Sequence, residues 1–154
     1  MRPIRAVLLL CLLPAALAAA EPARPGKIAL SELSFAGIEL GDSQAQVRKK
    51  LGKPTKTTGQ ADSYEHVFRY PGLDVTFFGD DVAGLSSSSP KRCTPSGACP
   101  GQTLVQAHAR LGRGAPPVPV DGRVEYYVED ETCWLRLDLG AGGRIETLAV
   151  VCLP

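Results

Sequence analysis

Cysteine is the residue type in this 154-residue chain whose number and spacing indicate definite chemistry. Once the first 20 residues are set aside, four cysteines remain: Cys93, Cys99, Cys133 and Cys152. An even number of cysteines in an exported chain is typical of disulfides. Cys93 and Cys99 flank a turn-rich segment that can close into a short loop, and Cys133 and Cys152 flank a predicted hairpin. We therefore predict the disulfides Cys93–Cys99 and Cys133–Cys152.

Histidine and serine could supply a base and a nucleophile if the chain were an enzyme. Strand alternation predicts that His66 points inward, and His108 is expected on the exposed face of a helix. Neither histidine has zinc-ligand spacing to a cysteine. Neither is spaced to form a triad with serines 86–89, which beside Pro90 are typical of a linker. We predict no catalytic residue, no metal and no cofactor.

Three further segments resemble ligand sites only in part. The glycine-rich residues 140–143 lie in a predicted hairpin, whereas a phosphate loop joins a strand to a helix. Asp80 and Asp81 could attract a calcium ion, but two carboxylates are more often part of a turn. The proline-rich residues 113–122 could offer a polyproline stretch to a partner or act as a stiff connector.

The first 20 residues have the layout of a secretory signal peptide. Arg2 and Arg5 give a basic start, residues 6–13 are apolar, and residues 18–20 are alanines suited to cleavage. A retained membrane anchor is the alternative, but the apolar run is shorter than the roughly 20 residues that span a bilayer. Cys11 lacks the preceding small residues of a lipid-attachment site. We predict a periplasmic or secreted protein with no stable membrane insertion after cleavage.

Cleavage after Ala20 leaves a nearly neutral chain. Removing Arg2 and Arg5 from the 17 basic residues leaves 15 against 16 acidic residues, a net charge of −1. This balance gives no electrostatic footprint for nucleic acid, so we predict no nucleic-acid partner. The remaining length suits one domain. We expect a flexible N-terminal segment over 21–34 and a single domain over 35–154.

Two segments that start 60 residues apart, 41–54 and 101–114, are punctuated as short helices. Each begins with a hydroxyl residue followed three positions later by glutamine, which is a capping-box pattern. A glycine stands where each helix should end, at Gly52 and at Gly112. The capping pairs are Ser43 with Gln46 and Thr103 with Gln106.

Three β-type segments follow each predicted helix. They cover residues 64–70, 73–78 and 82–86 after the first helix, and 124–129, 133–139 and 144–152 after the second. Because each helix is too short to persist alone, it needs a sheet to pack against. We predict an α+β fold of two pseudo-repeats, about 35–90 and 91–154. Each would be a short helix followed by three antiparallel strands, with one antiparallel sheet shared and both helices on one face.

The last predicted hairpin can be given a register. If Gly142 and Gly143 form a two-residue turn, Ala141 faces Arg144. The same register places Cys133 opposite Cys152. Directly opposed residues of antiparallel strands lie close enough for a disulfide.

Helices can cover only one face of the predicted sheet, so the other face should meet solvent. Aromatic residues mixed with charges on that face are typical of a binding surface. The alternative is that these aromatics cover one another as cross-strand pairs. The candidate partner-binding residues are Trp134, Tyr127, Phe78, Arg136, Arg69 and Asp74.

The pattern G-x-S/T-x-x-Q-x-x-x-x-L-G at residues 41–52 and 101–112 resembles the SmpA/OmlA family of bacterial envelope proteins. The tandem arrangement with two disulfides resembles the two-repeat beta-lactamase inhibitory protein. In that inhibitor the exposed, concave sheet face and its loops bind the target enzyme, so the resemblance implies protein binding by the exposed face. The chain differs from SmpA/OmlA proteins in lacking a lipid-acceptor cysteine and in having two copies of the pattern.

These observations predict a non-catalytic, periplasmic or secreted protein-binding module. It would act as an enzyme inhibitor or immunity-type protein, with an envelope or secreted enzyme or toxin as its partner. The alternative is an envelope or outer-membrane assembly or scaffolding factor of SmpA/OmlA type.

Overall fold

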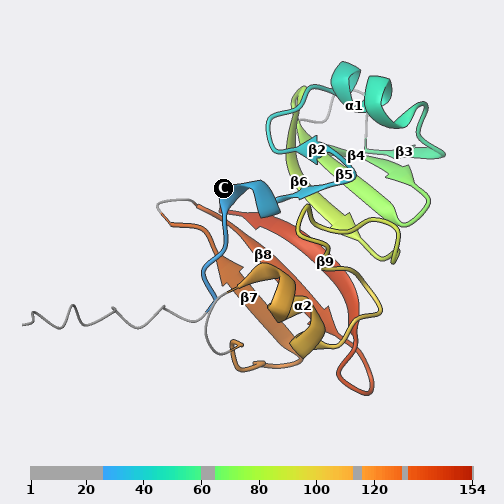
Figure 1. The fold of residues 1–154 in the computed structure, drawn as a ribbon. Coiled ribbons are helices and arrows are strands. Elements are labelled where there is room, and N and C mark those ends of the chain that lie inside the picture. Colours follow the sequence, from blue (N-terminus) through green and yellow to red (C-terminus); the bar gives the residue numbers. More distant parts are fainter. Residues whose placement is uncertain (1–25, 60–64, 113–115, 130–131, 154) are drawn as a thin grey trace, which may run out of the picture.

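A seven-stranded antiparallel sheet carries the fold, in the order β3-β4-β5-β6-β9-β8-β7 (Figure 1). The computed structural model describes residues 26–59, 65–112, 116–129 and 132–153. The strands of this sheet are β3 (Lys56–Thr58), β4 (Glu65–Tyr70), β5 (Leu73–Phe78), β6 (Asp81–Ser87), β7 (Arg123–Tyr127), β8 (Cys133–Leu139) and β9 (Ile145–Cys152). The other elements are η1 (Leu30–Glu32), β1 (Ser34–Phe35), β2 (Ile38–Glu39), α1 (Gln44–Leu51) and α2 (Leu104–Leu111). Neither helix of the described ranges has the length and apolar character needed to cross a membrane.

The predicted fold of two helix-plus-three-strand repeats sharing one sheet is wrong. Four strands, β3 to β6, follow α1, whereas three strands, β7 to β9, follow α2. In addition, β1 and β2 form a separate two-stranded sheet that precedes α1. The sequence of β3 is Lys-Thr-Thr, which has no apolar residue whose alternation could have revealed a strand.

Both helices begin at a capping box, as the sequence predicts. Ser43 Oγ accepts a hydrogen bond from the Gln46 N–H at 3.3 Å, and Gln46 Oε1 accepts from the Ser43 N–H at 2.7 Å. Thr103 and Gln106 form the same reciprocal pair at 3.3 and 3.0 Å. The expected glycines follow the two helices, at Gly52 and Gly112.

The core lies between the helices and the inward face of the sheet. A row of side chains in register across six strands is at most 4% exposed: Phe68, Val75, Leu85, Val150, Leu135 and Tyr126. Val47 of α1 and Ala107 of α2 are fully buried in the same core. Burying one large apolar side chain contributes about 1.5–3 kcal/mol, so this row supplies much of the driving force for folding.

Helix α2 packs more deeply than we predicted. His108, expected on its exposed face, is only 7% exposed, and its Nδ1 lies 3.0 Å from Tyr126 Oη. A buried hydroxyl needs a hydrogen-bond partner, and His108 supplies it. Burial also raises the pKa of Tyr126 to about 12.

Residues 26–34, which we expected to belong to a flexible segment, pack against the sheet. The Ile28 N–H donates to the Tyr127 carbonyl at 3.0 Å, and the Tyr127 N–H donates to the Gly26 carbonyl at 2.6 Å. Lys27 thereby pairs in parallel with Tyr127, at the outer edge of β7. Ile28 and Leu33 are 8% and 2% exposed, so this part of the chain belongs to the core.

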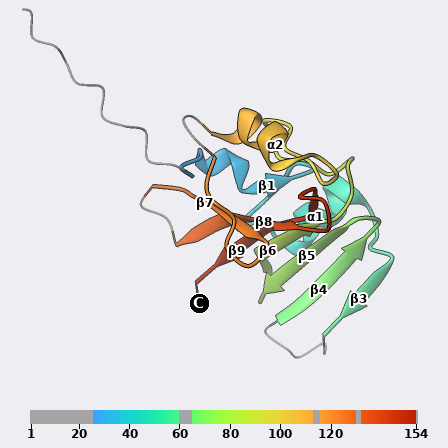
Figure 2. The ribbon, with the colours of Figure 1, turned by 90° about the horizontal axis from the view of Figure 1, so that it is seen from below.

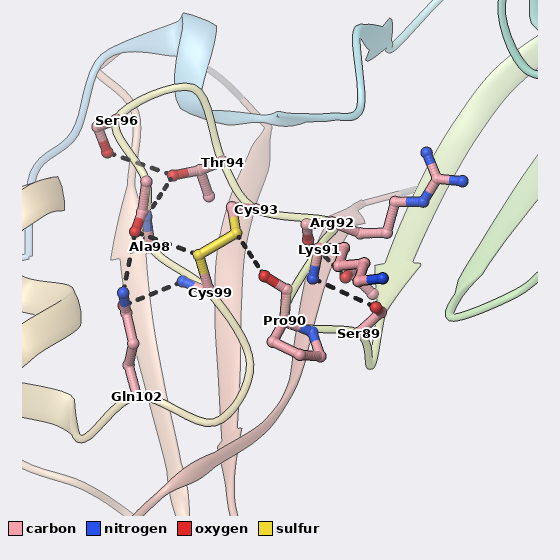
Figure 3. Close-up of a disulfide and its surroundings, with 12 residues drawn as sticks. Ser89, Pro90, Lys91, Arg92, Cys93, Thr94, Ser96, Ala98, Cys99 and Gln102 are labelled. Carbon is pink, nitrogen blue, oxygen red and sulfur yellow. Dashed lines mark hydrogen bonds between the residues drawn. A yellow bond between two sulfur atoms is a disulfide. The ribbon is translucent and has the colours of Figure 1, made fainter.

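The predicted disulfide Cys93–Cys99 closes the loop that precedes α2 (Figure 3). Within the loop, Thr94 Oγ1 accepts a hydrogen bond from the Ala98 N–H at 3.2 Å. The carboxylate of Glu32 accepts from Ser96 Oγ at 2.8 Å. This bond ties the loop to the N-terminal turn η1, which lies in the blue segment of Figure 2.

The second predicted disulfide, Cys133–Cys152, joins β8 to β9. The two cysteines are directly opposed, as the register predicted, with their Cα atoms 4.0 Å apart. Leu135 opposes Val150 in the same register, so the disulfide and the apolar pattern specify one pairing of the strands.

The turn of this hairpin differs from our prediction. The register shifts by one residue after Asp138, and the Gly140 N–H donates to the Arg144 carbonyl at 2.9 Å. Residues 141–143 therefore form the turn, in place of a two-residue turn at Gly142 and Gly143. The Glu146 side chain fills the space beside Gly140, where a Cβ would lie 1.9 Å from Glu146 Oε1.

Candidate functional site

The face of the seven-stranded sheet opposite the core is the candidate site, which we call the open face. Successive side chains of a strand point to opposite faces, so the neighbours of buried residues point here. One row in register across the sheet consists of Lys56, Arg69, Asp74, Ser86, Ala149, Arg136 and Glu125. Small side chains occupy the middle of this row, and charged ones occupy its two ends.

Trp134, Tyr127 and Glu125 form what we call the aromatic cluster, on β7 and β8. Trp134 opposes Tyr127 in register, and their ring centroids lie 6.2 Å apart. Trp134 Nε1 donates to Glu125 Oε1 at 3.2 Å, and the Tyr127 hydroxyl donates to Glu125 Oε2. One carboxylate therefore fixes both rings, while Tyr127 remains 50% exposed.

Glu125 also raises the pKa of the Tyr127 hydroxyl. The hydrogen bond to the carboxylate is the main cause, and partial burial and the negative charge of Glu125 act in the same direction. Ionised tyrosine beside Glu125 would place two like charges together. Tyr127 is therefore a neutral hydrogen-bond donor across the ordinary pH range.

The cation that faces Glu125 across the strands pairs with a different carboxylate. Arg136 opposes Glu125 in register, but its Nε lies 3.1 Å from Asp138 Oδ1. Arg123 Nε lies 3.4 Å from the same oxygen. Asp138 thus bridges two guanidinium groups, and the Glu125 carboxylate is directed at the two rings. Exposed ion pairs of this kind add little stability, so their main effect is to hold side chains in place.

The β4–β5 end of the open face is held more loosely. Arg69 Nε lies 3.8 Å from Asp74 Oδ2, and both side chains are largely exposed, at 51% and 44%. Phe78 stands at the last position of β5, opposite Glu65, and is 63% exposed. This end offers charge and apolar surface, and its Arg69–Asp74 ion pair is longer than the two ion pairs of Asp138.

All six sequence-predicted partner-binding residues lie on the open face, in two separate groups. Trp134, Tyr127 and Arg136 lie on β7 and β8, whereas the others lie on β4 and β5, with β6 and β9 between them. A partner that contacts both groups must therefore span the central strands. The group on β4 and β5 consists of Arg69, Asp74 and Phe78.

Strand alternation in the sequence also places Glu125 and Asp138 on this face, but neither was among the six candidate residues. The signal for Glu125 was its spacing of two residues from Tyr127 on a strand, which puts both side chains on one face. The signal for Asp138 was its identical spacing from Arg136. In each case the structure converts this spacing into a direct hydrogen bond.

A groove of about 410 Å³ lies beside the aromatic cluster, at the outer edge of β7. It is bounded by part of the predicted connector 113–122, of which the structure describes residues 116–122. Val118 and Val120 of this connector are 82% and 68% exposed. The residues that line the groove are Pro117, Val118, Val120, Asp121, Arg123, Glu125 and Tyr127.

Both histidines contact aromatic rings of the core. The His66 ring stacks on Phe77 with centroids 5.1 Å apart, and His108 meets Tyr126 as described above. Within the described ranges, no group of three or more His, Cys, Asp or Glu side chains is placed to hold a metal ion.

The chain is similar in fold to two solved structures of longer proteins. One is an extracellular protein containing a SCP domain from Bacillus anthracis, with TM-score 0.55 and 12% identity over 73% of this chain and 44% of that chain. The other is a cysteine-rich secretory protein from Staphylococcus aureus, with TM-score 0.56 and 9% identity over 86% of this chain and 50% of that chain. This chain thus spans about half the length of each.

No protein-family model and no curated protein matches the sequence. At these identities the similarity to the two solved structures is one of fold. Two disulfides, together with structural neighbours that are extracellular or secretory, are features of a secreted protein.

Proposed function

We propose that the chain is a non-catalytic protein-binding module of the periplasm or extracellular space, acting as an enzyme inhibitor or immunity-type protein. The aromatic cluster carries this proposal. Trp and Tyr are enriched at the energetic centres of protein interfaces. Rings that are already fixed lose little conformational entropy when a partner binds, and one carboxylate fixes both rings here.

The surroundings of the cluster support the same function. Arg123, Asp138 and Arg136 form a partly exposed polar network next to the two rings. A central aromatic contact with a polar rim is the usual anatomy of a protein interface. The proposal includes a relationship to SmpA/OmlA envelope proteins, supported by the two capping boxes and their following glycines.

Affinity capture from envelope and culture-supernatant fractions tests this function. The immobilised chain is compared with a Trp134→Ala, Tyr127→Ala double variant and with Val105→Ala as the matched control. Val105 is 72% exposed on α2, which lies on the other side of the sheet. We expect one partner in stoichiometric amount, at least about tenfold less of it with the double variant, and unchanged recovery with the control.

The activity of the captured partner separates the two candidate functions. Loss of its activity on addition of the chain supports an inhibitor, whereas recovery of several envelope proteins without loss of activity supports the assembly factor. Because Trp134 is partly buried, a Tyr127→Ser variant and thermal melts check that reduced capture does not reflect unfolding. Equal recovery by a folded double variant would exclude the aromatic cluster as the binding site.

A further inference from the structure

The groove beside β7 combines an aliphatic wall with carboxylates and one aromatic ring. Pro117, Val118 and Val120 supply the aliphatic surface, and the two valines are among the most exposed apolar side chains of the described chain. Glu125 and Tyr127 of the aromatic cluster line the same groove, so it continues the open face past its edge strand. Its volume of about 410 Å³ has room for a long side chain.

Backbone hydrogen bonds already occupy the outer edge of β7 at two places. Arg123 exchanges N–H and C=O bonds with Val120, both at 2.9 Å. Tyr127 bonds to residues 26–28 at the other end of the strand. A partner strand cannot add along β7 without displacing these bonds, because strand addition needs a free row of N–H and C=O groups. The groove therefore suits a side chain better than an added strand.

The charges that line the groove favour a cation. Asp121 and Glu125 are carboxylates, and Arg123 is the single cation among the lining residues. The guanidinium of Arg123 is paired with Asp138 at 3.4 Å. The exposed ring of Tyr127 adds a π face, to which ammonium and guanidinium groups are attracted.

We propose that this groove receives a basic side chain, lysine or arginine, from the protein partner. Its aliphatic stem lies against Pro117, Val118 and Val120, and its charged end meets the Glu125 and Asp121 carboxylates beside the Tyr127 ring. The stem of a basic side chain can bury on apolar surface while its head stays hydrated, which matches an open groove of this composition. This inference rests on the proposed function and names the partner chemistry that the site selects.

Nα-acetyl-lysine methylamide is the probe, and Nα-acetyl-norleucine methylamide, which has the same four-carbon stem without the ammonium group, is the control compound. Binding to the whole mature chain is followed by ¹H–¹⁵N NMR. We expect saturable shifts of the Val118, Val120 and Tyr127 amides and of the Trp134 indole N–H. The lysine probe should bind at least about fivefold more tightly than norleucine, and this advantage should shrink as salt is raised.

Glu125→Gln should weaken the lysine probe at least about threefold, and Asp121→Asn, which leaves the aromatic cluster intact, should also weaken it. Glu39→Gln removes an exposed carboxylate of β2 outside the groove and should change nothing. Equal binding of lysine and norleucine, absence of shifts at the groove, or unchanged affinity in both variants would overturn the inference. If the groove fails these tests but the chain still captures a protein partner, the proposed function stands without this inference. If the probe binds but no partner is captured, the result counts against the proposed function and not against the groove.

Discussion

The helices at the two ends of the sheet begin with the same type of capping box but bury different numbers of residues. Helix α1 buries only Val47, and its Arg48 guanidinium lies 4.4 Å from the centroid of the Phe68 ring. Helix α2 buries three residues, and its His108 meets the Tyr126 hydroxyl. Helices with the same type of cap therefore pack to different depths, because the contacts with the sheet determine how much of each helix is buried.

The same two ends also differ on the open face. At the β4–β5 end the open face carries the ion pair of Arg69 with Asp74 and the ring of Phe78. At the β7–β8 end the rings of Trp134 and Tyr127 are fixed, and the disulfide Cys133–Cys152 joins β8 to β9. The end with the stronger internal constraints is thus the end that carries the aromatic cluster, as expected if a proposed site must be held in place by its scaffold.

The largest effect should come from removing the disulfide of the α2 end. Cys133→Ser with Cys152→Ser should lower the free energy of unfolding by about 2–5 kcal/mol. Cys93→Ser with Cys99→Ser should have a smaller effect, because that bridge has a sequence separation of 6 compared with 19. Urea denaturation without reductant measures both. Equal losses would show that the two bridges do not constrain the chain differently.

Removing the buried hydroxyl of Tyr126 should have the next largest effect. Tyr126→Phe removes the hydrogen bond between the Tyr126 hydroxyl and His108 Nδ1 and should lower the free energy of unfolding by about 1–3 kcal/mol near neutral pH. Urea midpoints of the variant and the wild type measure this loss. Tyr70→Phe, at the α1 end, is the matched control, because it removes a tyrosine hydroxyl that donates to the Gly52 carbonyl at 3.1 Å.

The same tyrosine predicts a pH dependence. Its folded-state pKa of about 12 lies above the unfolded value of 10, so its contribution is complete below pH 10 and is lost as pH rises towards 12. That contribution is about 2–3 kcal/mol. Urea titrations between pH 9 and pH 11.5 should show a flatter decline in Tyr126→Phe than in the wild type. Parallel declines would contradict the assignment.

The two caps offer a direct comparison of the ends. Ser43→Ala and Thr103→Ala each remove one capping hydrogen bond and should lower the free energy of unfolding by about 0.5–2 kcal/mol. We expect Thr103→Ala at the upper part of that range, because α2 contributes more buried residues. Thermal melts of both variants provide the measurement, and the reverse order would argue against α2 as the more important helix.

The smallest effect on stability is expected for Glu125→Gln, because the cluster is partly exposed. The change should alter the free energy of unfolding by about 1 kcal/mol or less. It should also lower the pKa of Tyr127 towards its ordinary value, because the hydrogen bond to the Glu125 carboxylate is the largest cause of the rise. Ultraviolet titration of tyrosinate detects this shift. Asp74→Asn, at the loosely held end, should leave the tyrosine titration unchanged.

Local signals predicted the elements that depend on local chemistry. The capping pairs, the glycines that follow the helices and the alternation of β4, β5, β7, β8 and β9 were all visible in the sequence. The register of β8 and β9 was predicted from a two-residue turn that does not form, yet Cys133 opposes Cys152 as expected. The pairing persists because slipping by one residue would reverse every side chain.

Features that depend on tertiary contacts were not visible in the sequence. His108 was expected outside because it aligns with exposed Arg48, yet the hydroxyl of Tyr126 needs a partner at that depth. Residues 26–28 are held by β7, which is distant in sequence, and the segment 26–34 has no periodic pattern of its own. The sequence also did not show whether the Glu125 carboxylate would pair with Arg136 or accept hydrogen bonds from the aromatic side chains.

The attachment of residues 26–28 to β7 also limits when these residues can reach their native contacts. Lys27 bonds to Glu129, 102 residues further along the chain, and Ile28 bonds to Tyr127 at the end of β7. Contacts between such distant segments form slowly, because closing a long loop costs conformational entropy before the contacts contribute any stabilisation. A chain that is still emerging from a ribosome or a secretion channel cannot make these bonds until β7 has also emerged. Residues 26–28 are thus the first of the described residues to emerge, yet they must wait for β7 before they reach their native contacts.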